Sequence, residues 1–169
     1  MDSSDLKALQ APMKEKYRDA PESAVVTLKA RGSIDDASIA CKVETGRALA
    51  VAGLHPATGG SGLELCSGDM LLEALVACAG VTLKAVATAL EFQLAGANVL
   101  AEGDLDFRGT LGVAKDAPVG FREIRLSFDL DTGEPQERID TLIKLTERYC
   151  VVFQTLNTPP KLAVAASKA

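Results

Sequence analysis

The stretch MLLEALVACAGVTLKAVATAL, residues 70–90, decides the fold class. It is apolar almost throughout, and at 1.5 Å per residue it is long enough to span about 30 Å. Glu73 and Lys84 interrupt it. A helix that is apolar nearly all round is also typical of the buried axis of a globular domain. Because the flanks are acidic and the sequence offers no second candidate span, we expect a buried central helix and no membrane partner.

Length and composition predict one domain without a nucleic-acid partner. Of the 169 residues 47% are apolar and 24% charged, near the globular average, which excludes disordered and fibrous classes. The net charge is −5 and the sequence has no run of Lys and Arg, so nucleic acid and anionic membranes are poor partners. We expect a domain over 23–158, a polar and partly helical extension over 1–22, and a tail or edge strand over 159–169.

Alternation of apolar and polar residues predicts strands on both sides of the central helix. A meander of three strands with a turn at 32–36 precedes the helix, and two strands with one polar face each follow it. The predicted strands cover 26–30, 39–43, 48–54, 101–108 and 124–131. The last two favour antiparallel pairing through a hairpin-type loop over 115–120, with a helix on their apolar face.

The remaining pattern is helical and completes an α+β fold. Ser67 or Asp69 is expected to cap the central helix. From Pro135 to about residue 153 the apolar residues follow a helical period. The order βββ-α-ββ-α is typical of an α+β domain and not of a doubly wound parallel sheet.

Four cysteines and one histidine limit the chemistry. The cysteines, at positions 41, 66, 78 and 150, form no CxxC motif, so a structural zinc site has no support. The single histidine, His55, is expected to be a surface loop residue, and one histidine cannot build a His-based triad or a multi-histidine metal site. The acidic N-terminus has no apolar segment of a signal peptide. We therefore expect a cytoplasmic protein with reduced thiols.

Cys78 and Cys150 fall on the apolar stripes of the two predicted helices. Thr82 lies one turn after Cys78, on the same helix face. Free cysteines are usually buried and only pack. Cysteines on two adjacent packed helices can, however, also reach the Cα separation of about 4.4–6.8 Å that a disulfide needs. The residues alone leave packing and reactivity open.

The segments around these two cysteines resemble the OsmC/Ohr family, the osmotically inducible protein C and organic hydroperoxide resistance proteins. CSGDMLLEALVACAGVT, residues 66–82, is similar to the family's central helix with its C-x-x-x-T element. RYCVVFQTL, residues 148–156, is similar to its second motif, an aromatic residue followed by Cys. The resemblance covers roughly 23–158 and implies an intertwined homodimer with a long buried central helix in each subunit.

The resemblance also implies a thiol-dependent peroxidase. Cys78 would attack a small organic hydroperoxide and become a sulfenic acid, and Cys150 would resolve it as a disulfide. An external dithiol reductant would then restore both thiols. This chemistry needs no cofactor.

A peroxidatic thiol must be activated. Lowering its pKa from about 8.5 to about 7 takes roughly 2 kcal/mol, and Cys78 lies too deep in its helix for the N-terminal dipole, so we expect a cation near it. The resemblance implies Arg31 for this role, with Arg18 and Arg47 as substitutes, braced by an acid. Asp69 or Glu73 would be that acid. Without such a role, Arg31 is a solvated strand-end charge and Asp69 a helix cap.

Three features depart from the family pattern. Val151 stands where the family often has Pro, which would let the helix continue and aim Cys150 differently. Cys66 is either a competing resolving thiol or a bystander, and Cys41 is expected in the core. These departures keep two alternatives open: a redox-responsive or apolar-ligand-binding dimer without turnover, and a structural domain whose cysteines only pack.

Overall fold

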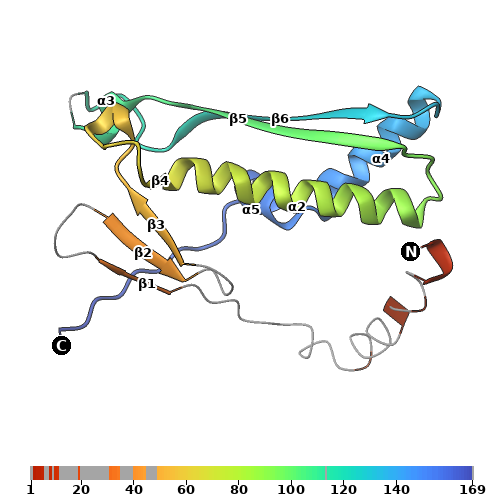
Figure 1. Ribbon diagram of the computed structural model, residues 1–169, viewed down its shortest axis with the longest axis horizontal. Helices are drawn as coiled ribbons and strands as arrows, with labels where there is room; N and C mark the ends of the chain where they lie inside the picture. Colours follow the sequence, from red (N-terminus) through yellow and green to blue (C-terminus); the bar gives the residue numbers. More distant parts are fainter. Residues whose placement is uncertain are drawn as a thin grey trace.

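The computed structural model describes residues 2–5, 8, 10–11, 19, 31–34, 40–44, 49–112 and 114–168, and of residues 31–49 only the backbone. Its elements follow an α+β order (Figure 1). They are β1 (Arg31–Ile34), β2 (Ala40–Glu44), β3 (Leu49–Gly53), the 3-10 turn η2 (Pro56–Thr58), β4 (Leu65–Cys66), α2 (Ser67–Ala89), β5 (Gly96–Leu105), α3 (Phe107–Thr110), β6 (Phe121–Asp131), α4 (Gln136–Tyr149) and α5 (Val151–Asn157). The strand predicted at 26–30 and most of the N-terminal extension lie outside the described residues.

The first sheet is a meander, as predicted, with one added strand. β1, β2 and β3 pair antiparallel in that order, and β4 joins β3 in parallel. Strand β1 occupies Arg31–Ile34, where we expected a turn over 32–36. That prediction is wrong for 32–34, because the ladder to β2 holds Gly32 and Ser33 extended although neither residue favours a strand.

The second sheet is the long antiparallel pair β5 and β6. Its register runs from Gly96 opposite Asp131 to Leu105 opposite Phe121. The connection is not the simple hairpin that the sequence predicted, since it contains the short helix α3. The Asp106 side chain accepts from the backbone N–H of Arg108 and so ends the strand and starts this turn. Phe107, expected in the strand, therefore lies in α3.

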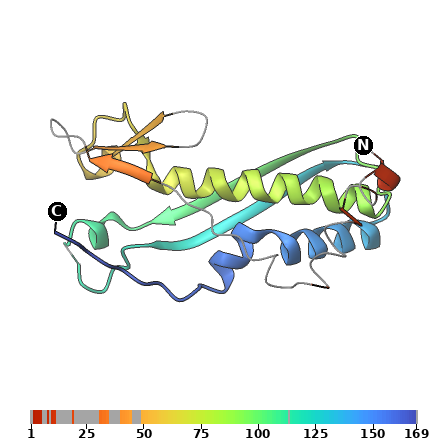
Figure 2. The same ribbon diagram turned by 90° about the horizontal axis from the view of Figure 1, so that it is seen from below.

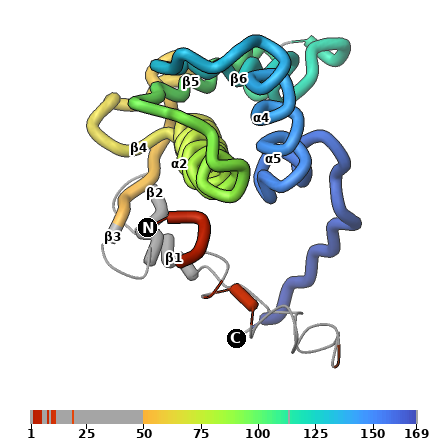
Figure 3. The backbone as a smooth tube through the Cα atoms, turned by 90° about the vertical axis from the view of Figure 1, so that its right-hand side faces the viewer, coloured from red at the N-terminus to blue at the C-terminus, as the bar shows by residue number. Residues whose placement is uncertain are grey.

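Helix α2 is the axis of the fold. β5 and β6 cover one side of it, and α4 with α5 covers an adjoining side, as the views from below and along the helix show (Figures 2 and 3). Two clusters of buried side chains hold this packing. One consists of Leu83, Ala87, Phe92 and Leu142 and the other of Leu75, Ala79 and Cys150. The predicted central helix is confirmed in position and length, and its buried residues all lie on one face.

The two ends of α2 are held differently. Its first residue follows Cys66, whose backbone is extended and whose side chain makes no capping bond, so the expected cap from Ser67 or Asp69 is wrong. At the other end Arg138 of α4 donates to the carbonyl of Leu90 at 3.0 Å and pairs with Glu134 at 2.8 Å. The C-terminal end of α2 is thus tied to α4, whereas its first turn has no side-chain cap.

The predicted C-terminal helix is divided in two. α4 ends at Tyr149, Cys150 has an extended backbone (φ −73°, ψ 108°), and α5 begins at Val151. Beyond α5 the residues 158–168 form neither helix nor strand. The division matters because it lies at one of the two cysteines that the sequence singled out.

Candidate functional site

Cys78 and Cys150 come from separate elements and meet at the centre of the molecule. Cys78 lies in the middle of α2, and Cys150 lies between α4 and α5. Cys150 is 1% exposed and clusters with Leu75 and Ala79, and Cys78, which is half-buried, packs against this cluster. The fully buried Ala79 lets the two elements approach closely, because its side chain is only a methyl group.

The seam around the two thiols is largely apolar. Hydrocarbon side chains from both long strands and from α5 pack against the cluster. They are Val99 and Ala101 of β5, Ile124, Leu126 and Phe128 of β6, and Val152, Phe153 and Leu156 of α5. Hydrogen bonds and charges act strongly in such surroundings, because little water competes with them.

The interruption between α4 and α5 at Cys150 directs backbone N–H groups toward this seam. The Cys150 N–H still donates to the carbonyl of Thr146 at 2.9 Å, and the Cys150 carbonyl accepts from the Gln154 N–H at 2.9 Å. One extended residue therefore ends α4 and starts α5 while its own N–H and carbonyl stay paired. Val151 does not let the helix continue, so the expectation tied to its replacing Pro is wrong: the break forms without proline.

The Cys78 thiol is stabilised in its ionised form. Partial burial raises its pKa, but hydrogen bonds from the backbone N–H groups of Val152 and Val151 and from the side chains of Cys150 and Thr82 together outweigh burial. The pKa of Cys78 is therefore below its usual value, since these donors favour the thiolate.

The Cys150 thiol is affected in the opposite direction. Burial raises its pKa, and the neighbouring Cys78 raises it further, while the N–H groups of Phe153 and Val152 compensate only in part. The surroundings therefore favour the thiolate form of Cys78 and the protonated form of Cys150.

The backbone donors are the part of the site that sequence reasoning missed. We expected a cation because Cys78 is too far from the start of its own helix, and the donors come from a different element. The extended residue that creates them left one signal in the sequence, the pair Val151-Val152 directly after Cys150, at a position where the resembled family often has proline.

The predicted cation stays a prediction. Of Arg31 the structure describes only the backbone, at the start of β1, and Arg18 and Arg47 lie outside the described residues. Among the side chains that are described, no Lys or Arg contributes to the pKa of Cys78.

The two acidic candidates lie on another face of α2. Asp69 is nine residues and Glu73 five residues before Cys78. At about 100° per residue they lie roughly 180° and 140° around the helix from the thiol. Both are exposed, so neither carboxylate faces Cys78 of its own chain. Their role in bracing a cation stays a prediction.

The other cysteines and the histidine lie away from the seam. Cys66 is half-buried at the start of α2, and Cys41 is described only as backbone of β2. His55 is not a plain surface residue, because its ring stacks on Phe107 at 4.8 Å and its Nδ1 accepts from the Ala57 N–H at 3.0 Å. In the part of the chain that the structure describes, no group of three His, Cys, Asp or Glu side chains is placed to hold a metal ion.

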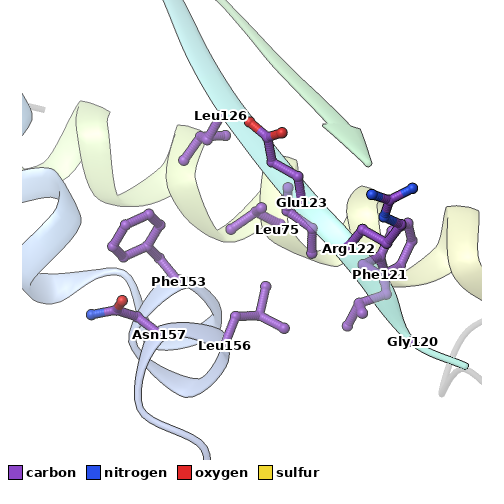
Figure 4. Close-up of a pocket in the computed structure, with 11 residues that line it drawn as sticks. Leu75, Gly120, Phe121, Arg122, Glu123, Leu126, Phe153, Leu156 and Asn157 are labelled. Atoms are coloured by element: carbon purple, nitrogen blue, oxygen red, sulfur yellow. The ribbon is translucent and has the colours of Figure 1, made fainter. Parts of the chain in front are cut away.

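A cavity of about 540 Å³ adjoins the seam between α2, β6 and α5 (Figure 4). Leu75, Phe153 and Leu156 line both this cavity and the cluster around Cys150. Arg122 and Glu123 direct their charged groups away from these apolar side chains. The cavity thus offers an apolar space one layer of side chains from the thiols.

Comparisons with known proteins agree with this fold. The model of the family described as OsmC-like protein matches residues 60–165, and no curated protein matches the sequence. Similar solved structures include an OsmC-like protein from Mycoplasma pneumoniae (17% identity, 79% of this chain and 89% of that chain covered, TM-score 0.65) and an organic hydroperoxide resistance protein from Elizabethkingia anophelis (14%, 80% and 91%, 0.64). Another is an OsmC-like protein of unknown function from Vibrio cholerae (12%, 78% and 94%, 0.60).

These solved structures share the fold at low sequence identity, and the family match covers the central helix, the second sheet and both helices that flank Cys150. Because that match spans more than half of the chain, this protein belongs to the OsmC-like protein family.

Proposed function

We propose that the protein is a cysteine-based peroxidase that reduces organic hydroperoxides in oxidative-stress defence. The observation that supports it best is the contact between Cys78, whose pKa is lowered, and Cys150, whose pKa is raised, in an apolar seam. The name of the Elizabethkingia anophelis structure, an organic hydroperoxide resistance protein of the same fold, points in the same direction.

The proposed reaction begins at Cys78. Its thiolate attacks the distal oxygen of the hydroperoxide, so that a sulfur–oxygen bond forms while the oxygen–oxygen bond breaks. The alkoxide leaves and takes up a proton to become the alcohol, and the sulfur is oxidised by two electrons to a sulfenic acid. The N–H groups of Val151 and Val152 stabilise the negative charge on the sulfur before the attack.

Cys150 completes the cycle. Its thiol attacks the Cys78 sulfenic acid, a disulfide forms and water leaves. An external dithiol then reduces the disulfide and is itself oxidised to a disulfide. The protonated state of Cys150 suits this order, because it keeps Cys150 less reactive than Cys78 toward the hydroperoxide.

The working unit in this proposal is a cytoplasmic homodimer. Arg31, Arg18 or Arg47, from the same chain or its partner, supplies a positive charge that adds to the backbone donors. The apolar cavity beside Leu75 and Phe153 suits the hydrocarbon part of the substrate, because burying it there removes apolar surface from water.

The test is turnover of cumene hydroperoxide by the purified protein with dithiothreitol. We expect Cys78→Ser to abolish turnover. We expect Cys150→Ser to accumulate a sulfenic acid that a cyclic 1,3-dione traps and mass spectrometry detects. Cys66→Ser is the matched control, because it removes a half-buried thiol outside the seam, directly before α2, and it should keep turnover. Full activity of Cys78→Ser would refute the mechanism.

The cavity also favours a second candidate, an apolar-ligand-binding dimer without turnover. In that case the purified protein binds an apolar fluorescent dye in a way that Leu156→Arg prevents, and the hydroperoxide is not consumed. Dye binding without turnover supports the second candidate over the first. A structural domain with inert cysteines would show neither.

A further inference from the structure

Helix α5 packs against the thiol cluster but is weakly held. It has seven residues, and a helix of this length is marginal by itself in water. None of its residues is buried, and residues 158–168, which follow it, are all exposed and form neither helix nor strand. Its main attachments are the chain at Cys150 and three apolar side chains that pack against the cluster around that thiol, Val152, Phe153 and Leu156.

The first turn of α5 has no cap from its own sequence. Cys150, the residue before it, makes no side-chain capping bond, and no acidic residue lies in the first turn. The free N–H groups of a first helical turn need an acceptor where little water reaches them. With both cysteines reduced, Cys78 supplies it, because the N–H groups of Val151 and Val152 donate to its sulfur. A group of α2 thus takes the place of the missing cap of α5.

Oxidation removes this acceptor. When Cys78 and Cys150 join in a disulfide, the sulfur of Cys78 no longer carries a negative charge. A neutral disulfide sulfur is a weak acceptor, so two N–H groups in a largely apolar seam lose most of the strength of their hydrogen bonds. The element that loses stability is α5, since the first turn of α4 lies at the end remote from Cys150.

Reduction of the disulfide needs access to a buried sulfur. Cys150 is 1% exposed, and Phe153 and Leu156 of α5 pack against its cluster and line the adjoining cavity (Figure 4). A reducing thiolate must reach a disulfide sulfur directly, because it forms a bond to that sulfur while the sulfur–sulfur bond breaks. With α5 in place, these side chains obstruct the approach from the cavity.

We propose that α5 is a redox-sensitive lid, closed while Cys78 is a thiolate and opened about Cys150 by formation of the disulfide. The dithiol reductant then attacks the sulfur of Cys150, so that a mixed disulfide forms and Cys78 leaves as a thiolate. The second thiol of the reductant attacks the mixed disulfide and passes its proton to Cys150, and the reductant leaves as a disulfide. The thiolate of Cys78 again accepts the two N–H groups, and α5 closes.

Cys78 is the better leaving group even while α5 is open. The hydroxyl of Thr82, on the same helix, also donates to its sulfur and does not move with α5. Because a sulfur stabilised as an anion leaves faster, attack at Cys150 is the favoured direction of reduction. The inference rests on the redox cycle of the proposed function, but its tests use a disulfide that is made without a hydroperoxide.

The first experiment compares amide hydrogen exchange in the dithiol and disulfide forms. Diamide takes two hydrogen atoms from the thiol pair, and peptide mapping verifies the bond between Cys78 and Cys150. We expect the amides over 151–157 to exchange about tenfold faster or more in the disulfide form, because two hydrogen bonds to a charged group are lost. Helix α4 is the control, since it also has no side-chain cap, and exchange over 136–145 should not change.

A variant separates the charge from the disulfide. Cys78→Ser replaces the thiolate by a neutral hydroxyl of similar size, so exchange over 151–157 should be about threefold faster or more without any oxidation. Cys66→Ser removes a half-buried thiol outside the seam and should leave this exchange unchanged. If Cys78→Ser does not fold, the comparison of the two forms of the unchanged protein still decides the question.

The second experiment changes the helix propensity of α5 alone. Thr155 is exposed, and alanine favours a helix over glycine by about fivefold in the equilibrium constant. Since reduction requires α5 to open, dithiothreitol should reduce the disulfide of Thr155→Gly about fivefold faster than that of Thr155→Ala. The same two substitutions at Lys144, an exposed position of α4, are the control and should give equal rates.

Three results would overturn the proposal. The first is a pair of cysteines that diamide does not join, and the second is exchange over 151–157 that is no faster in the disulfide form. The third is an equal rate of reduction for the two Thr155 variants. A protein without peroxidase turnover that passes these tests has the lid and not the proposed function. Turnover with unchanged exchange would show the reverse.

Discussion

Two half-buried thiols lie in the middle and at the entrance of helix α2, and their surroundings differ. Cys78 lies in the middle of the helix, against an apolar cluster and backbone N–H donors from α5. Cys66 is the last residue of the short strand β4 and directly precedes the first helical turn, which has no side-chain cap. The difference indicates that the properties of a thiol depend on the groups that pack against it.

The largest expected difference between the two regions is in stability. Leu75, which is 1% exposed beside Cys150, and Leu65, which is 45% exposed beside Cys66, form a matched pair. We expect Leu75→Ala to lower the free energy of unfolding by about 2–5 kcal/mol, because it leaves a cavity in packed surroundings. Leu65→Ala should change it by about 0.5 kcal/mol. Urea unfolding at one fixed protein concentration measures both, and equal losses would contradict the comparison.

The next difference is in reactivity toward iodoacetamide. The thiolate is the reacting form, and each unit of pKa changes its fraction about tenfold below the pKa. Since the pKa of Cys78 is lowered and that of Cys150 raised, the alkylation rate of Cys78 should reach half its maximum at a lower pH than that of Cys150. At pH 7 we expect Cys78 to be alkylated faster than Cys150, as measured by peptide mass spectrometry with Cys66 as an internal reference. A reversed order would refute the assigned roles.

Thr82→Val sharpens the comparison within the seam. The hydroxyl of Thr82 is one of the groups that lower the pKa of Cys78, and valine keeps its shape. Loss of a hydrogen bond of about 0.5–1.5 kcal/mol should slow alkylation of Cys78 at pH 7 about three- to tenfold. Thr88→Val is the control. The hydroxyl of Thr88 donates to the Lys84 carbonyl, and Thr88 lies almost two helical turns beyond Thr82. If both substitutions slow alkylation of Cys78 equally, the effect comes from a general change in the helix and not from the lost hydrogen bond to the thiol.

Val151→Pro should have an effect of similar size. Cys150 already has the extended backbone that the residue before a proline requires, and proline suits a first helical position. The substitution removes one of the two N–H donors to Cys78, so we expect alkylation to slow about three- to tenfold. Val151→Ala keeps the N–H and should not slow it. Unfolding of the proline variant would contradict the geometry of the break.

Much of the fold was predictable because its signals are local. The apolar stretch at 70–90 and the alternation in β2, β3, β5 and β6 follow directly from side-chain periodicity. The strand β1 was missed because its ladder to β2, a tertiary pairing, decides it. The helix α3 was missed because one local capping contact of Asp106 interrupts an otherwise strand-like pattern.

The site was predictable in its residues and not in its electrostatics. The helical stripes put Cys78 and Cys150 on inner faces, and the structure brings them together. The second stripe was interpreted as one helix from 135 to 153. That interpretation missed the extended residue between the two helices, which directs the N–H groups of Val151 and Val152 at Cys78. Backbone donors have no side-chain signature of their own, so the pair Val151-Val152 after Cys150 is their one indirect mark in the sequence. Helix geometry places Asp69 and Glu73 on another face of α2 than Cys78, and their role in bracing a cation stays a prediction.

The tie between Arg138 and the last turn of α2 has a consequence for how this helix opens. Its carbonyl end is held by Arg138, which donates to the Leu90 carbonyl and pairs with Glu134, whereas its amide end begins at a residue without a side-chain cap. Fraying therefore proceeds from the amide end, and deuterium should enter the first turn of α2 long before the last. Cys78 lies beyond this first turn, so the backbone amides around it stay protected from exchange while the first turn opens.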